Sequence, residues 1–324
     1  MTRRSSPRGV TTAAYRPAVH EPQHLQAGLT IVPSGVLHDL GRIPFEPLHE
    51  IEGQAALGDI PRALFRIERE RHILKCYSKK CPPSRNPAVA EIPDRRAPPC
   101  GARPYALRYD ARGNGMSDWD VDELSLDAWV ADLETVVDEV GVDRFPLLGI
   151  SQGDAVSVAY AVRHPERVSR LILYGAFALG GKKRAPAEKE MRDAMTTLMR
   201  LGWGADNASF RQMFTARFVP GGTHEQADFF NELQRKTTSS ECAARYFEVC
   251  GDFDIIDLLP RVKAPTLVMH VRDDLVTPFE TGRQLASGIP GARFIALPGR
   301  NHLFLEHEPA SNRFFEEIRL FLGG

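Results

Sequence analysis

The sequence lacks the features that would place the protein in a membrane or on nucleic acid. It has no run of 18 apolar residues, so we expect no transmembrane helix and no membrane partner. Its 41 Lys and Arg against 42 Asp and Glu leave a formal net charge of −1, which argues against a nucleic-acid partner. The first twenty residues carry arginines but no apolar core of a secretory signal, so we expect a cytoplasmic protein.

Cysteine is also scarce. The five cysteines are Cys76, Cys81, Cys100, Cys242 and Cys250. Their spacing matches no metal-binding pattern, because a single C-x4-C pair is weak support for a metal site. We therefore expect free thiols in a reducing compartment rather than disulfides or a metal centre.

Regular patterning is missing from the first third of the chain. Up to Arg103 there are 16 Lys and Arg against 10 Asp and Glu, and 13 of the 24 prolines. Prolines interrupt most candidate elements there. The exceptions are a predicted strand at Gly28–Val32 and a predicted helix at Ile60–Lys75. We interpret residues 1–104 as an atypical, Pro-rich, basic segment, and residues 105–324 as the main domain.

From Tyr105 onward, predicted strands alternate with predicted helices. Strands are expected at 105–110, 145–150, 168–175, 264–271 and 292–297, and helices at 126–140, from Ser151 to His164, and at 309–321. Ser125 is expected to cap the first of these helices and Gly141 to end it. Helical, less apolar sequence fills roughly 181–258. The alternation predicts an α/β protein with a mostly parallel sheet and helices on both faces.

The stretch GISQG, residues 149–153, has the spacing G-x-S-x-G. A serine hydroxyl is a weak nucleophile, which needs a base, a group to orient that base, and donors for the oxyanion. This motif places the serine on a tight turn between a strand and a helix. By itself it also arises as an incidental glycine-rich turn. Here it follows a buried strand and opens an amphipathic helix, so we predict that Ser151 is a nucleophile.

A histidine base should follow in a loop at the carboxyl end of a later strand, where open α/β sheets place their active sites. PGRNHLFLEHEP follows the predicted strand at 292–297. His302 is the predicted base, and His307, nearer the last helix, is the alternative. His270 lies inside a predicted strand, so we expect a packed core histidine there.

The acid should precede the histidine in the chain. RDDLVTP follows the predicted strand at 264–271 and offers two aspartates. Asp274 is favoured over Asp273, because the spacing D-x-x-x-P to Pro278 suits the turn.

Four stretches together resemble the α/β-hydrolase superfamily, and within it the esterase, lactonase and carboxylesterase-like members that also occur fused to bacterial transcriptional regulators or adenylate cyclases. They are RYDARGNGMSDWD, LLGISQGDAVSVAYAVRHPERVSRLILYG, LLPRVKAPTLVMHVRDDLVTPFE and IPGARFIALPGRNHLFLEHEP. The resemblance covers about residues 105–324. It implies a Ser151–His302–Asp274 triad, the Gln152 N–H as one oxyanion donor, and no metal or organic cofactor.

The same resemblance implies a small helical lid within about 181–258. Apolar lid residues that could contact a substrate are Trp203, Phe210, Met213 and Phe214, with Leu198 and Leu201 nearby. The alternative is that these side chains pack the lid onto the core.

The sequence departs from the family pattern before Tyr105. The family's second oxyanion donor follows its third strand, in a loop that often starts His-Gly, and residues 1–104 contain no His-Gly. TIVPSGVLHDL, residues 30–40, is a candidate strand and loop that would bring Ser34 or Gly35 near the site. The alternatives are a disordered stretch or a shifted reading frame. Recovery of peptides from residues 1–100 of the native protein would contradict the frame hypothesis.

Asp154 is a second departure, because the family has a small residue at this position. An acid in the first turn favours the helix dipole, by about 0.3–1 kcal/mol at exposed sites. A carboxylate aimed at the oxyanion site would instead oppose catalysis. We expect this side chain to point away from the chemistry.

The sequence therefore predicts a serine hydrolase that cleaves carboxylic ester or lactone bonds through an acyl-enzyme. A non-catalytic ligand-binding or sensor domain on the same fold, and an inactive product that lacks the N-terminal half of the sheet, remain alternatives. The partner is expected to be a small-molecule ester or lactone. The sequence does not identify that substrate or the oligomeric state.

Overall fold

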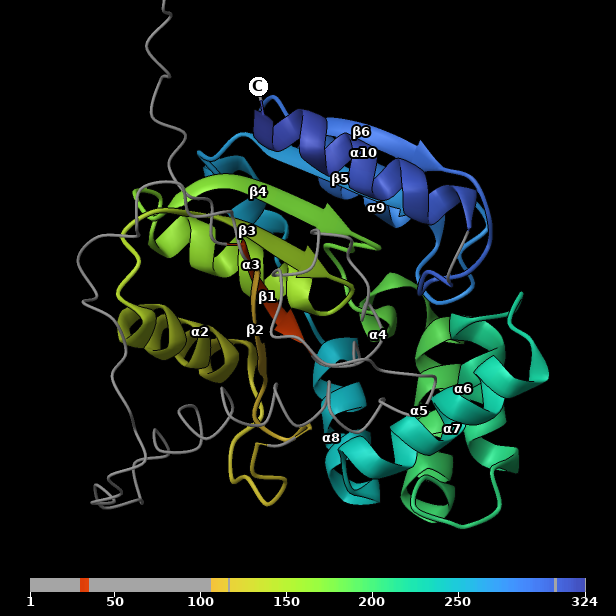
Figure 1. Cartoon of the computed structure of the whole chain (residues 1–324). Helices are drawn as coiled ribbons and strands as arrows, with labels where there is room; N and C mark the ends of the chain where they lie inside the picture. Colours follow the sequence, from red (N-terminus) through yellow and green to blue (C-terminus); the bar gives the residue numbers. More distant parts are fainter. Residues whose placement is uncertain (1–29, 35–105, 116, 306–307, 324) are drawn as a thin grey trace, which may run out of the picture.

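A computed structural model describes residues 30–34, 106–115, 117–305 and 308–323. The strands of these residues form one parallel sheet in the order β2-β1-β3-β4-β5-β6 (Figure 1). They are β1 (Thr30–Ser34), β2 (Ala106–Asp110), β3 (Phe145–Ile150), β4 (Val168–Tyr174), β5 (Thr266–Val271) and β6 (Arg293–Leu297). The predicted α/β class and the five strands expected after residue 104 are confirmed.

The early strand lies inside the sheet, between β2 and β3. Five residues of β1 pair with β2, but only Ile31 pairs with β3, opposite Leu147. The strand begins and ends two residues later than the predicted Gly28–Val32, and it runs through Pro33. Pro33 has no N–H to donate to a neighbouring strand, which is consistent with the short pairing between β1 and β3. The predicted helix at 60–75 lies outside the described residues.

The helices that follow the strands cover both faces of the sheet. They are α2 (Leu126–Val140), α3 (Gly153–Arg163), α9 (Phe279–Gly288) and α10 (Pro309–Gly323). Ser125 caps α2 by accepting a hydrogen bond from the Ala128 N–H, and Gly141 ends it with φ of 69°. Both features confirm the prediction.

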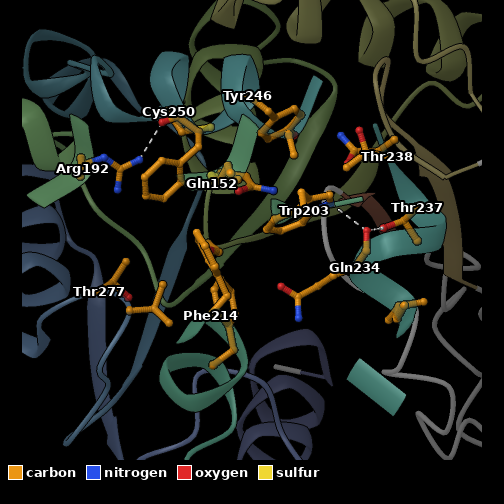
Figure 2. Close-up of a pocket in the computed structure, with 18 of the residues that line it drawn as sticks. Gln152, Arg192, Trp203, Phe214, Gln234, Thr237, Thr238, Tyr246, Cys250 and Thr277 are labelled. Carbon is orange, nitrogen blue, oxygen red and sulfur yellow. Dashed lines mark hydrogen bonds between the residues drawn. The ribbon is translucent and has the colours of Figure 1, made fainter. Parts of the chain in front are cut away.

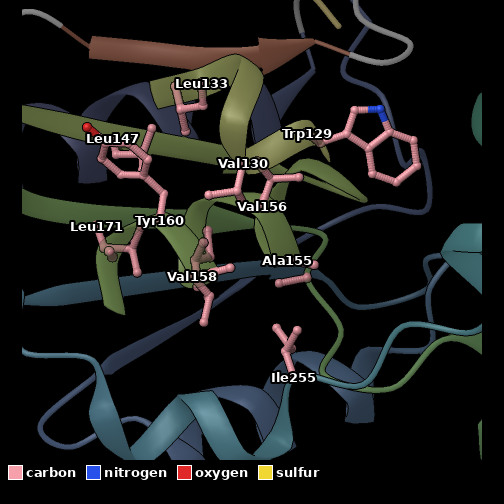
Figure 3. Close-up of a cluster of buried hydrophobic side chains, with 14 of the residues drawn as sticks. Trp129, Val130, Leu133, Leu147, Ala155, Val156, Val158, Tyr160, Leu171 and Ile255 are labelled. Carbon is pink, nitrogen blue, oxygen red and sulfur yellow. The ribbon is translucent and has the colours of Figure 1, made fainter. Parts of the chain in front are cut away.

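Alternate residues of the strands supply two hydrophobic cores. Leu147, Leu171 and Leu173 face a core shared with α2, α3 and α9, part of which Figure 3 shows around Leu133 and Val158. Their neighbours Leu148, Ile172 and Tyr174 face the second core. Phe314 and Ile318 of α10 complete this core. Strands buried on both faces explain the continuous apolar runs in the sequence.

The lid is a set of helices inserted between β4 and β5, beyond the carboxyl ends of the strands (Figure 1). It consists of α4 (Gly181–Arg184), α5 (Pro186–Gly202), α6 (Ser209–Phe218), α7 (His224–Thr237) and α8 (Ser240–Gly251), and the 3₁₀ helix η1 (Ile256–Arg261) leads back to the sheet. Met195, Met199, Trp203 and Phe214 form a small core of its own. No helix among the described residues is long and apolar enough to cross a membrane.

Candidate active site

Ser151 lies on the sharp turn between β3 and α3. Its φ is 54°, the sole positive φ of a non-glycine residue in the described part of the chain. This left-handed conformation is strained for a side chain with a Cβ, and such strain concentrates at functional sites. The Ser151 N–H donates to Tyr174 O at 2.8 Å, which ties the turn to the end of β4.

The glycine before the serine is required by packing. A Cβ at Gly149 would lie 2.8 Å from Asp154 Cα and 2.8 Å from Ser157 Oγ, closer than real contacts allow. The elbow helix therefore lies directly against the end of β3. Gln152 occupies the N-cap of α3, where the first backbone N–H groups lack partners within the helix.

His302 and Asp274 form a buried pair at the same edge of the sheet. His302 Nδ1 and Asp274 Oδ2 are 2.6 Å apart, and both side chains are fully buried. Asp274 Oδ1 accepts hydrogen bonds from the backbone N–H groups of Val276 at 2.7 Å and Thr277 at 3.1 Å. Burial alone would raise the pKa of Asp274, but the charge and hydrogen bond of His302, the charge of His270 and the Thr277 N–H hold it below its ordinary value.

The other nitrogen of this histidine is available for chemistry. His302 Nε2 is buried and has no hydrogen-bond partner among the described residues. The ring packs edge-on against Phe218 of the lid, at 5.3 Å between centroids, and against the backbone of Gly175. Gly175 directly follows Tyr174. The Tyr174 carbonyl accepts a hydrogen bond from the Ser151 N–H, and the Tyr174 hydroxyl donates one to His302 O. The serine turn and the histidine loop are thus joined through the end of β4.

The rival residues lie elsewhere. Asp273 is exposed. His270 is buried inside β5 and its Nε2 lies 2.9 Å from Thr277 O. Burial lowers the pKa of His270. It lies behind the acid, 3.7 Å from Asp274 Oδ2. His307 is outside the described residues.

A pocket of about 1120 Å³, counted with its opening to solvent, lies between the sheet edge and the lid (Figure 2). Ser151, Gln152, Trp203 and Phe214 line it. Phe210 instead packs on Phe214 within the lid core. Met213 lies outside the pocket and 47% of it is exposed, so it drops out of the candidate substrate contacts. A mostly apolar pocket with a few polar groups is typical of small-molecule sites.

Sequence reasoning missed other residues that line this pocket, including Arg184, Arg192, Tyr246 and Cys250. Arginines in a helical, weakly apolar segment look like solvated surface charges, so the sequence carried no signal to single them out. Cys242 and Cys250 are free buried thiols, as expected for two of the five cysteines. The described residues hold no group of three or more His, Cys, Asp or Glu side chains suited to a metal ion.

Asp154 is fully buried, and its carboxyl is directed at the loop after β4. Its Oδ2 accepts the Phe177 N–H at 2.6 Å, while Oδ1 has no partner among the described residues. Burial raises the pKa of Asp154 well above its ordinary value, against the lowering effect of the Phe177 and Ala155 N–H groups. The residue is absent from the pocket lining. The carboxyl therefore lies behind the elbow rather than in front of Ser151.

The end of β1 lies in the right part of the sheet for a second oxyanion donor. Ser34 pairs with Asp110, which lines the pocket. The parallel register from Ile31 and Leu147 carries Ser34 to the level of Ile150, next to Ser151. The other candidate, Gly35, lies outside the described residues.

Known proteins with the same fold are numerous. Residues 106–309 match the family described as alpha/beta hydrolase fold. A 2-hydroxy-6-oxononadienedioate/2-hydroxy-6-oxononatrienedioate hydrolase of Cupriavidus pinatubonensis is 30% identical over 240 residues, which cover 71% of this chain and 80% of that protein. An esterase from Exiguobacterium antarcticum superposes with a TM-score of 0.59 at 25% identity, over 66% of this chain and 80% of that one. An enol-lactonase from Burkholderia xenovorans LB400 has a TM-score of 0.62 at 18% identity, over 92% of both chains, and shows the fold alone.

Proposed function

Because the chain belongs to the α/β-hydrolase fold family, we propose that it is a serine hydrolase of carboxylic esters or lactones. The observation that carries the proposal is the buried His302–Asp274 pair, 2.6 Å between Nδ1 and Oδ2, joined through Tyr174 at the end of β4 to a serine with φ of 54°. A base held by an acid, next to a nucleophile on a strained turn, is the arrangement that acyl transfer requires. The proposal includes a small-molecule substrate and a cytoplasmic location.

The first half of the proposed reaction forms an acyl-enzyme. Ser151 Oγ attacks the carbonyl carbon while His302 Nε2 takes its proton. The oxyanion accepts a hydrogen bond from the Gln152 N–H at the start of α3, where the helix dipole also favours negative charge. Collapse breaks the bond to the leaving oxygen, which receives the proton from His302. In a lactone this oxygen stays tethered to the acyl group.

The second half returns the free enzyme. His302 takes a proton from a water molecule, whose oxygen attacks the acyl carbon, and the proton then passes to Ser151 Oγ as the acid leaves. Asp274 stays ionised throughout: it orients His302 and stabilises its cationic form. The depressed pKa of Asp274 supports this role. A second oxyanion donor at Ser34 or Gly35 belongs to the proposal, because the loss of one donor costs about 10²–10³ in rate.

The test combines covalent labelling with ester hydrolysis. A fluorophosphonate should label Ser151 in the folded full-length chain, and Ser151→Ala should lose labelling and lower kcat by roughly 10⁴-fold or more. Asp274→Asn should keep the fold but lower kcat by about 10⁴-fold, because Asn holds the wrong tautomer of His302. Ser287→Ala, an exposed serine of α9, is the matched control.

Two outcomes would contradict the proposal. Labelling that persists in Ser151→Ala would place the nucleophile elsewhere. A folded protein that neither labels nor hydrolyses simple esters, yet is stabilised by a pocket ligand, would be a binding or sensor domain instead.

A further inference from the structure

Two arginines of the lid line the same pocket as Ser151. Arg184 ends α4 and Arg192 lies in the second turn of α5. In Figure 2, Arg192 and Cys250 lie at one side of the pocket, Thr237 and Thr238 at the other, and Gln152 between them. The proposed hydrolysis uses neither arginine.

Arg192 has no carboxylate within ion-pair distance among the described residues, although the Glu188 carboxylate acts on its charge from further away. Its Nη2 donates to Phe247 O at 2.7 Å, and its guanidinium lies 3.7 Å from the centre of the Phe247 ring. Its Nε is buried without a partner, and no acidic side chain of the described residues lies within 4.0 Å. Burial lowers the pKa of Arg192 to about 10, which leaves it a cation at neutral pH. An uncompensated charge beside an apolar pocket is costly to keep without a counter-charge.

The surrounding backbone leaves room for this side chain. A Cβ at Gly251 would lie 2.8 Å from Arg192 Nε, and a Cβ at Gly181 would lie 2.6 Å from Arg192 Cδ. Any larger residue at either position would displace the arginine. The two glycines and the Phe247 ring therefore hold the guanidinium in one place at the pocket wall.

Arg184 adds a donor but little net charge. Its Nε donates to Glu188 Oε2 at 2.7 Å, an ion pair between neighbouring turns. Its Nη1 is buried and has no partner among the described residues. Glu188 is thus the carboxylate near both arginines, and Arg217 of α6 adds a further positive charge nearby, so this side of the pocket carries a net positive charge. Two buried nitrogens, Arg184 Nη1 and Arg192 Nε, have no partner among the described residues.

The acidic residue of the pocket lining, Asp110, lies at the other side. Asp110 adjoins Gly115, whose N–H donates to Thr237 O at 2.7 Å. Thr237 and Arg192 face one another across the pocket in Figure 2. The lining therefore places its two arginines away from its acidic residue, and an anionic group would be drawn to the arginine side.

We infer that the pocket selects esters or lactones that carry a single carboxylate remote from the reacting carbonyl, with this carboxylate seated on Arg192 and assisted by Arg184. A guanidinium presents parallel N–H donors that match a carboxylate, and the net positive charge of this side attracts an anion. Binding at this remote group holds the carbonyl at Ser151. The inference rests on the proposed serine hydrolysis.

The test compares matched anionic and neutral substrates. The anionic series consists of the mono-p-nitrophenyl esters of adipate, pimelate and suberate. In the neutral series, 6-methylheptanoate, 7-methyloctanoate and 8-methylnonanoate esters replace the carboxylate by an isopropyl group of similar shape. For at least one chain length, the anionic ester should have a kcat/KM roughly 10-fold or more above its neutral partner.

The variants assign this preference to Arg192. Arg192→Met keeps the stem on Phe247 and should reduce the anionic-to-neutral ratio by about 10- to 100-fold, mainly through KM. Arg192→Lys should retain part of the ratio, because lysine keeps the positive charge but lacks the paired N–H donors of the planar guanidinium. Arg200→Met, an exposed arginine on the same helix, should leave the ratio as it is in the wild type.

The results separate this inference from the proposed function. A ratio near 1 in the wild type, or a ratio that Arg192→Met leaves unchanged, overturns the carboxylate site while hydrolysis itself stands. If neither series is hydrolysed, Ser151→Ala with monomethyl adipate provides a second readout, a thermal shift. A shift that Arg192→Met abolishes supports the carboxylate site without catalysis, and the absence of any shift overturns it.

Discussion

Among single residues, Asp154 combines an ionisable side chain with a fully buried environment. A carboxyl group is buried behind the elbow with one hydrogen bond, from the Phe177 N–H, and one oxygen without a described partner. The bond joins the first turn of α3 to the loop after β4. That loop also contains Gly175, which touches His302. Asp154 thus stabilises the geometry of the site from behind, and its raised pKa favours the neutral acid there.

The raised pKa of Asp154 predicts a pH-dependent effect on stability. An acid with a raised pKa in the folded state binds more protons there than in the unfolded state, so stability falls as pH rises above the unfolded pKa. Asp154→Asn removes this titration and keeps the acceptor for the Phe177 N–H. We expect the Tm of Asp154→Asn minus that of the wild type to increase from pH 5 to pH 8, by calorimetry. A constant difference over this range would show that the acid is ionised in the folded protein.

At the scale of elements, the lid is held together by a buried cation. Arg211 of α6 is fully buried and donates to Asn231 O of α7 at 2.9 Å and to Trp203 O at the end of α5 at 2.8 Å. Trp203 in turn donates its indole N–H to Gln234 O. One guanidinium on α6 therefore binds carbonyl groups at the end of α5 and in α7 and links the three helices.

Arg211→Met should destabilise this lid. Met fills similar space but leaves at least two buried carbonyl acceptors unpaired, at about 1–3 kcal/mol each. We expect a loss of at least about 2 kcal/mol in the free energy of unfolding, measured by urea denaturation. Arg235→Met, at a partly exposed arginine of α7 paired with Glu232, should change it by less than about 0.5 kcal/mol. Equal effects of the two substitutions would contradict the role of Arg211.

For the whole molecule, the integrity of the sheet depends on five residues of the early chain. Without β1, β2 would have no partner strand, since β1 alone separates it from β3 in the described sheet. The five-residue pairing of β1 with β2 and its link to β3 at Ile31 join the Gly-rich loop after Asp110 to the elbow. The atypical composition of residues 1–104 thus coexists with a strand that belongs to the sheet.

Hydrogen exchange of the native full-length chain tests this placement. A peptide that covers Thr30–Ser34 should exchange at least about 10²-fold more slowly than an unstructured peptide, because its amides bond to neighbouring strands. Pro33 has no amide and contributes nothing. Peptides from β4 and from the exposed turn at Ala205–Asn207 serve as slow and fast references. Exchange of the β1 peptide at the rate of the exposed turn would remove this strand from the sheet.

The sequence by itself determined the parts whose signals are local. Strand periodicity, Ser125 and Gly141 at the ends of α2, and G-x-S-x-G after an apolar run need only neighbouring residues to be read. The candidates Asp274 and His302 also followed locally, because loops after parallel strands meet at one edge whatever the details of packing. The predicted Ser151 nucleophile and its partners therefore needed no knowledge of the lid.

Only the tertiary structure decided what depends on distant segments. It places β1 between β2 and β3 through pairing that proline-rich sequence obscured. It directs Asp154 at the Phe177 backbone, and it brings Arg192 to the pocket between two glycines separated by 70 positions. Burial and electrostatics arise from everything packed around a group, so a charged residue in a sequence carries no mark of whether water or a pocket will surround it.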